Sequence, residues 1–114
     1  MDSLFGIFNV NKPVGITSHD VVQRVRNLTG VRRVGHAGTL DPLASGVLVV
    51  LVGRQATRLA RFLFGSDKTY RAVVRLGEST PSYDAESEVT ERRPVDVSRA
   101  DVDAALDDFR GEIA

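Results

Sequence analysis

Thirteen residues in the first half of the chain constrain its fold more than any other segment. Residues 34–46 (VGHAGTLDPLASG) hold three glycines, a histidine, an aspartate and a proline, and the apolar run VLVVLV follows directly at residues 47–52. Glycine reaches backbone angles that other residues avoid. Pro42 fixes its own φ and pushes Asp41 toward an extended backbone. We therefore expect a stiff loop that leads into a buried strand and presents Asp41 in a fixed position.

Composition narrows the class of protein. The chain has 114 residues, 42% of them hydrophobic, which fits one small domain or part of a larger one. It has no cysteine and only two histidines, so neither disulfides nor a histidine-rich metal site is expected. The start of the chain lacks the basic residues of a signal peptide, and the run at 47–52 is too short to span a bilayer. We expect a cytoplasmic protein that does not enter a membrane.

Charge is unevenly distributed along the chain, although the net charge is zero. Residues 1–76 hold eleven Lys and Arg against four Asp and Glu, a net charge of +7, and residues 77–114 carry the opposite −7. Some of the arginines can be solvated side chains on helix surfaces. A basic segment of this extent also favours a polyanionic partner, and nucleic acid is the most plausible one.

Hydrophobic spacing predicts the elements of the first half. Residues 4–10 are typical of a strand, and Thr17 or Ser18 is expected to cap a helix over 18–28 that ends at Gly30. The buried face of this helix is predicted from its apolar residues, which are Val21, Val22, Val25 and Leu28. A second buried strand is expected at residues 47–52. A second helix is expected over 55–64, with its inward face formed by Ala56, Leu59, Ala60 and Leu63.

The second half is predicted to contain one long strand, at residues 68–76, with Tyr70 on one of its faces. Residues 77–87 have the composition of a polar loop, and residues 89–97 allow an edge strand. Ser98 is expected to cap a third helix whose core face would comprise Val102, Ala105, Leu106 and Phe109. The chain stops shortly after Gly111, where that helix should end, and we therefore expect it to be part of a longer protein.

Asp41 is the strongest candidate for chemistry. A carboxylate on a rigid loop can act as a nucleophile or as a general base. It can equally be an Asx-turn residue that accepts hydrogen bonds from nearby backbone amides. Unrelated hydrolase chemistry is a weaker possibility, because no second carboxylate or histidine stands at a familiar catalytic spacing from it.

The sequence around Asp41 closely resembles a known signature. Residues 35–46 (GHAGTLDPLASG) are similar to the motif of the TruB family, the bacterial tRNA pseudouridine synthases that modify uridine 55 in the T-loop. Four further segments match family motifs in the expected order: KPVGITS at 12–18, GRQAT at 53–57, KTY at 68–70 and LGEST at 76–80. The resemblance covers essentially the whole chain.

The resemblance implies a fold and a reaction. The fold would be α+β, with a mixed, largely antiparallel sheet and flanking helices. The reaction would cleave the N-glycosidic bond of the uridine, after which the uracil rotates and rejoins the ribose through carbon. Asp41 would be the catalytic carboxylate, and no metal or other cofactor is implied. The partner would be the T-loop of tRNA, bound by a monomer.

Four further residues receive roles from the resemblance. Tyr70 would stack on the flipped target base, although an alternating strand also accommodates a core tyrosine. His36 would contact RNA near that nucleotide, or else stabilise its loop through a backbone hydrogen bond. Lys68 would contact RNA or support Tyr70. Lys12 would contact phosphate or brace the Asp41 loop.

The resemblance also implies what the chain does not contain. Residues 1–114 correspond to the N-terminal part of the catalytic domain, whereas its second half, with a catalytic-site arginine, and a C-terminal RNA-binding extension lie outside them. We therefore expect the isolated polypeptide to have little or no activity. The alternatives are a non-catalytic, truncated RNA-binding relative and a member of the guide-RNA-dependent branch. The compact N-terminus favours the stand-alone bacterial type over the latter.

Overall fold

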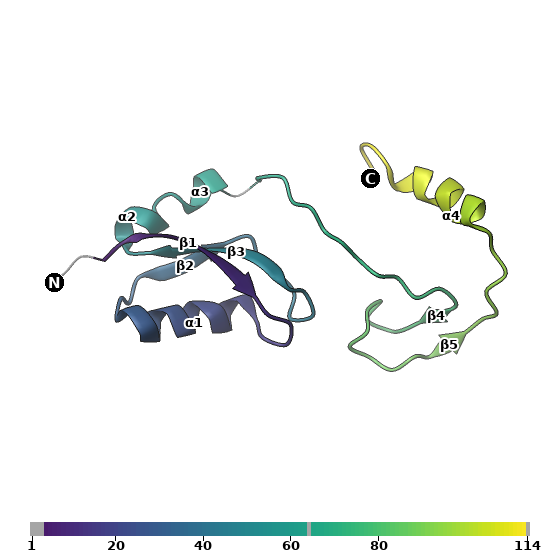
Figure 1. Cartoon of the computed structure of the whole chain (residues 1–114), viewed down its shortest axis with the longest axis horizontal. Helices are drawn as coiled ribbons and strands as arrows, with labels where there is room; N and C mark the ends of the chain where they lie inside the picture. Colours follow the sequence, from purple (N-terminus) through teal and green to yellow (C-terminus); the bar gives the residue numbers. More distant parts are fainter. Residues whose placement is uncertain (1–3, 64, 114) are drawn as a thin grey trace. The chain divides into compact units, whose positions relative to one another are not determined.

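The computed structural model describes residues 4–63 and 65–113 (Figure 1). The chain divides into two compact units, Met1–Tyr70 and Arg71–Ala114. The first unit holds the principal sheet and the Asp41 loop. None of the helices in the described ranges is long and apolar enough to cross a membrane.

A three-stranded antiparallel sheet forms the centre of the first unit. Its strands are β1 (Gly6–Lys12), β2 (Val34–Ala37) and β3 (Gly46–Val52), in the order β1-β3-β2. The apolar run expected to be buried is thus the central strand. β1 confirms the first predicted strand, shifted by two residues. β2 corrects the prediction of a continuous loop, because its pairing with β3 depends on a tertiary contact that local composition does not reveal.

Helix α1 (Ser18–Thr29) has the ends that the sequence predicts. Thr17 is its N-cap, and the Thr17 hydroxyl accepts from the Asp20 amide at 2.9 Å while the Asp20 carboxylate accepts from the Thr17 amide at 2.9 Å. Gly30 ends the helix in the left-handed conformation, with φ at 72°. These reciprocal bonds satisfy amides that the first helical turn would otherwise leave unpaired.

The core lies between α1 and one face of the sheet. Its buried members come from the helix and from β2 and β3: Val21, Val22, Val25, Val34, Leu48, Val50 and Val52. The sequence predicts that Leu28 is also buried, but its side chain is 86% exposed. It lies in the last turn of α1, beyond the part that meets the sheet. The prediction for this residue was wrong.

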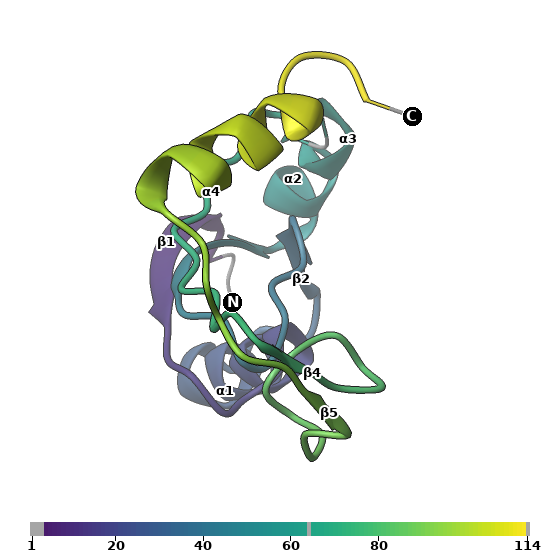
Figure 2. The same cartoon turned by 90° about the vertical axis from the view of Figure 1, so that its right-hand side faces the viewer.

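The segment after β3 forms two short helices in place of the single helix predicted for 55–64. These are α2 (Arg54–Thr57) and α3 (Ala60–Leu63), and Figures 1 and 2 place them on the side of the sheet away from α1. The Leu59 amide donates to the Ala56 carbonyl at 2.9 Å, a three-residue turn that interrupts the α-helical pattern. Ala56 is buried as predicted, but Leu59 is exposed. The last predicted residue, Phe64, lies outside the described residues.

The second unit has little regular structure. A two-stranded antiparallel ribbon joins β4 (Glu78–Ser79) to β5 (Glu91–Arg92), within the segments predicted as a polar loop and an edge strand. Helix α4 (Arg99–Leu106) begins at the predicted Ser98 cap and continues into the 3-10 turn η1 (Asp107–Phe109). Its predicted core face is not buried, since Leu106 and Phe109 are both exposed.

Residues 66–75 form neither helix nor strand, so the strand predicted for 68–76 is wrong for this structure. A strand requires backbone hydrogen bonds to a neighbour. None of the described residues pairs with this segment as a sheet partner. The alternating pattern alone therefore does not make it a strand here.

Candidate active site

Asp41 lies in the loop of residues 38–45 that joins β2 to β3. Its side chain is exposed, and its carbonyl accepts the Ala44 amide at 2.9 Å, which closes a turn through Pro42. Within residues 4–63 and 65–113, no hydrogen bond from a backbone amide reaches the Asp41 carboxylate. The Asx-turn interpretation is therefore not supported. The carboxylate is available to a molecule outside the protein.

The backbone on the N-terminal side of Asp41 is held by Ser18. The Ser18 hydroxyl donates to the Leu40 carbonyl at 3.1 Å and lies 3.0 Å from the Leu40 amide, which donates to it. Ser18 is buried at the start of α1. Because Thr17 caps the helix, the adjacent hydroxyl is free to make this contact with the loop.

The backbone on the C-terminal side of Asp41 is held by two groups, one from the last residue of β1 and one from the turn that follows it. The Gly15 amide donates to the Pro42 carbonyl at 2.7 Å, and the Lys12 ammonium lies 3.5 Å from the same oxygen. Asp41 thus stands between two residues whose peptide groups are fixed by α1 and by the chain that precedes it. Fixed geometry of this kind keeps a reactive side chain in place before its substrate arrives.

Lys12 occupies the bracing position. Its side chain has no exposed surface, and its ammonium donates at 2.7 Å to each of the Pro13 and Ile16 carbonyls. Together with the Pro42 contact these bonds satisfy a charge that would otherwise be costly to bury. A buried ammonium in this arrangement does not reach an RNA phosphate. The phosphate-contact interpretation of Lys12 is therefore corrected to the bracing one.

His36 lies on β2, where it pairs with Val50, and its side chain is partly buried. Burial lowers the pKa of His36 below its usual value, and the positive charge of His19 lowers it further. The His36 Nδ1 atom is buried without a hydrogen-bond partner among the described residues. The expected backbone hydrogen bond is thus not made by that nitrogen. The imidazole lies close to the loop, and its RNA contact stays a prediction.

The Lys68 side chain lies against the Asp41 loop, whereas the Tyr70 side chain is exposed. A Cβ atom built on Gly38 would lie 3.2 Å from the Lys68 ammonium nitrogen, so the lysine lies directly against this glycine, whose φ is +82°. Tyr70 is 64% exposed in the irregular segment 66–75. It is not a core tyrosine of a strand, and its stacking role stays a prediction.

The side chains present do not assemble a metal centre. Across the described ranges, no three His, Cys, Asp or Glu side chains are close enough together to hold an ion.

The fold and the Asp41 loop agree with one class of enzyme domain. Residues 26–114 match the family model for the TruB family pseudouridylate synthase N-terminal domain. The chain therefore belongs to the TruB family of pseudouridylate synthases.

Its curated relatives carry a more specific name. Proteins named tRNA pseudouridine synthase B are similar to it: 63% identical over 91 residues in Thermobifida fusca, 52% over 109 in Dehalococcoides mccartyi and 49% over 110 in Geobacillus kaustophilus. The matches cover 80%, 95% and 95% of this chain but only 31%, 36% and 38% of the relatives. The chain thus spans about a third of their length.

The chain is also similar to solved structures, among them one described as an H/ACA RNP bound to a substrate RNA containing 2'-deoxyuridine. The match has 46% sequence identity and a TM-score of 0.49, and it covers 52% of this chain and 18% of that one.

Proposed function

We propose that the chain is the N-terminal part of the catalytic domain of a synthase that converts uridine 55 of tRNA to pseudouridine. The observation that carries this proposal is the exposed Asp41 carboxylate between two anchored peptide groups. Membership of the TruB family supports it, and the relatives carry the name tRNA pseudouridine synthase B. A tRNA substrate would be met in the cytoplasm.

In this reaction Asp41 would act on the uridine whose glycosidic bond is broken. The bond between the ribose C1′ and the uracil N1 breaks, the uracil rotates, and C1′ bonds to C5, which loses its proton while N1 gains one. A carboxylate held still by its neighbours can attack or stabilise the separated groups without first being ordered.

The neighbouring residues would bind the substrate. Lys68, which lies against Gly38, would contact the RNA backbone beside the loop. Tyr70 would stack on the everted base, because an exposed aromatic ring suits an unstacked nucleotide. The imidazole of His36 would contact the adjoining nucleotide. Lys12 would act indirectly, by holding the loop.

The experiment replaces the N-terminal segment of the Thermobifida fusca relative with residues 1–114 and measures tritium release from T-loop RNA labelled at uracil C5. Asp41→Asn should reduce release to background while RNA binding is retained. Asp67→Asn removes a carboxylate from outside the loop and should leave the rate unchanged. Release at an unaltered rate from the Asp41→Asn protein would remove Asp41 from the chemistry.

A non-catalytic RNA-binding protein is the second candidate. It is favoured by the basic character of residues 21–66, which contain seven arginines and one carboxylate. In that case the chimaera would bind T-loop RNA without releasing tritium, even with Asp41 intact.

A further inference from the structure

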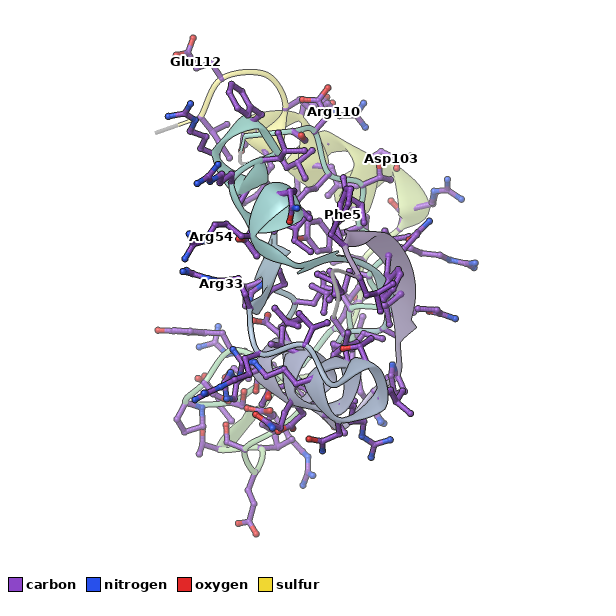
Figure 3. The ribbon with its side chains drawn as sticks, turned by 90° about the vertical axis from the view of Figure 1, so that its left-hand side faces the viewer. Phe5, Arg33, Arg54, Asp103, Arg110 and Glu112 are labelled. Carbon is purple, nitrogen blue, oxygen red and sulfur yellow. The ribbon has the colours of Figure 1, made fainter. Side chains whose placement is uncertain are left out.

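A basic surface lies at the end of the sheet remote from Asp41. Arg33 directly precedes β2 and Arg54 begins α2 just after β3, and the Gly53 amide donates to the Arg33 carbonyl at 2.7 Å. This bond fixes the two arginines as neighbours. Figure 3 shows both side chains extending from the ribbon in the same direction, and both are exposed.

Two more arginines adjoin this pair. The Arg26 guanidinium donates to the Arg32 carbonyl at 3.0 Å and to the Val34 carbonyl at 3.1 Å, which fixes the backbone that carries Arg32 and Arg33. Arg26 and Arg32 also line a surface hollow of about 500 Å³. We call Arg26, Arg32, Arg33 and Arg54 the distal arginine surface.

Acidic residues do not offset this charge. Residues 21–66 contain seven arginines, and their only carboxylate is that of Asp41. Every ion pair among the described residues lies within residues 75–110. The positive charges of neighbouring arginines repel each other, so the surface is best stabilised by an anionic ligand.

The Asp41 loop and the distal arginine surface are separated by the length of β3. Its seven residues extend about 20 Å at roughly 3.3 Å per residue. A nucleotide at Asp41 therefore cannot occupy the distal surface as well. A rigid RNA stem that continues from the loop can reach it. Guanidinium groups match phosphate oxygens in geometry and charge, and such contacts do not depend on sequence.

We propose that the distal arginine surface binds the phosphate backbone of a base-paired RNA stem, at a place separate from the Asp41 loop. The proposal rests on the proposed function for its choice of RNA. The surface contributes affinity and orientation, and chemistry stays at the loop. The partner is recognised by its closely spaced phosphates and not by its bases.

The test measures fluorescence anisotropy of the full 114-residue chain with two labelled RNAs, a stem-loop and a blunt duplex without a loop. Arg33→Ala combined with Arg54→Ala should weaken binding of both RNAs by about tenfold, and should reduce the slope of log affinity against log salt by roughly 1.8 for two lost phosphate contacts. Arg33→Lys combined with Arg54→Lys should retain most of the affinity, because the charge remains. This second variant also separates lost charge from a fold defect.

The matched control is Arg99→Ala combined with Arg110→Ala, which removes two exposed arginines that pair with Asp103 and Asp107. It should bind both RNAs unchanged. The proposal is overturned if the alanine pair at 33 and 54 binds the duplex with unaltered affinity and salt slope, or if the unsubstituted chain does not bind the duplex. A change in self-association in place of RNA affinity would likewise overturn it, in favour of a protein partner.

The result is independent of the catalytic assignment. Asp41→Asn should leave duplex binding intact. If tritium release fails to depend on Asp41 while duplex binding depends on Arg33 and Arg54, the proposed function fails and the distal surface stands. If tritium release depends on Asp41 while duplex binding does not depend on Arg33 and Arg54, only the proposal for the distal arginine surface fails.

Discussion

One hydroxyl group, that of Ser18, engages both peptide groups of Leu40, donating to its carbonyl at 3.1 Å and accepting from its amide at 3.0 Å. Leu40 immediately precedes Asp41. The first residue of α1 therefore sets the backbone direction at which the candidate catalytic side chain leaves the loop.

Removing that hydroxyl should destabilise the protein. Ser18→Ala leaves the Leu40 amide and carbonyl without this partner, so we expect the free energy of unfolding to fall by about 2 kcal/mol. Urea unfolding followed by circular dichroism measures the change. Ser45→Ala, at an exposed serine of the same loop, should change stability little. Equal effects of the two substitutions would mean that the Ser18 bonds do not hold the loop.

Substitutions of Lys12 and Lys68 should have different effects, the first on stability and the second on RNA binding. Lys12→Met removes the buried donor that serves three backbone carbonyls, and we expect a loss of about 3 kcal/mol in the free energy of unfolding. Lys68→Met, at an exposed lysine, should leave stability near its original value but weaken binding of T-loop RNA. Unfolding curves and anisotropy titrations on both variants test this. The bracing role fails if Lys12→Met unfolds at the original urea concentration.

Gly53 should tolerate no side chain, whereas Gly65 should tolerate one at moderate cost. Their φ angles are nearly equal, +84° and +85°, so alanine meets the same backbone strain at both. At Gly53 alone a Cβ would also lie 2.7 Å from the Phe5 Cβ and 3.0 Å from the Leu4 carbonyl. We expect Gly53→Ala to cost about 2 kcal/mol more than Gly65→Ala. Similar unfolding midpoints for the two variants would contradict the close contact.

Acidification should destabilise the fold through His36. Its pKa is lowered in the folded protein, chiefly by burial and secondly by His19. Between the lowered pKa and the ordinary value near 6.5, the unfolded chain binds a proton that the folded chain does not. Stability is therefore at its full value above that ordinary pKa and falls as the pH drops below it.

The measurement is urea unfolding at pH 7.5 and pH 5.5. His36→Gln should lose less stability between these two pH values than the unsubstituted chain. His19→Gln should keep most of the original dependence, because burial is the larger cause of the shift. An unchanged pH dependence in the His36→Gln protein would show that another group titrates.

Elements defined by local signals were predicted from the sequence. Thr17 and Asp20 form a capping box at the start of α1, and Gly30 takes the left-handed conformation at its end. Each signal involves only residues close in sequence, so the predicted bounds of α1 agree closely with the observed ones. The box at Ser98 and Asp101 gave the start of α4 in the same way. The apolar run that became β3 was predictable because a central strand, buried here at Leu48 and at residues 50–52, leaves little room for polar residues.

Features that depend on distant partners were not predictable. β2 requires β3 beside it, and the alternation at 68–76 did not become a strand in the absence of a paired neighbour. Within the site, the sequence indicated Asp41, and the family resemblance assigned Lys68 to RNA contact or to support of Tyr70. The position of Lys68 against Gly38 came only from the structure. The sequence did not reveal the Ser18 contact, although Asp20 three residues after Thr17 was a signal that Thr17 would be the cap and Ser18 would be available.

β1 and β2 are the outer strands of the three-stranded sheet, and no described residue pairs with the far side of either. Such borders act as templates onto which further extended polypeptide can be added. At high concentration, the edge strands of different molecules of this chain should therefore pair with one another, and the sheets would extend into fibrils.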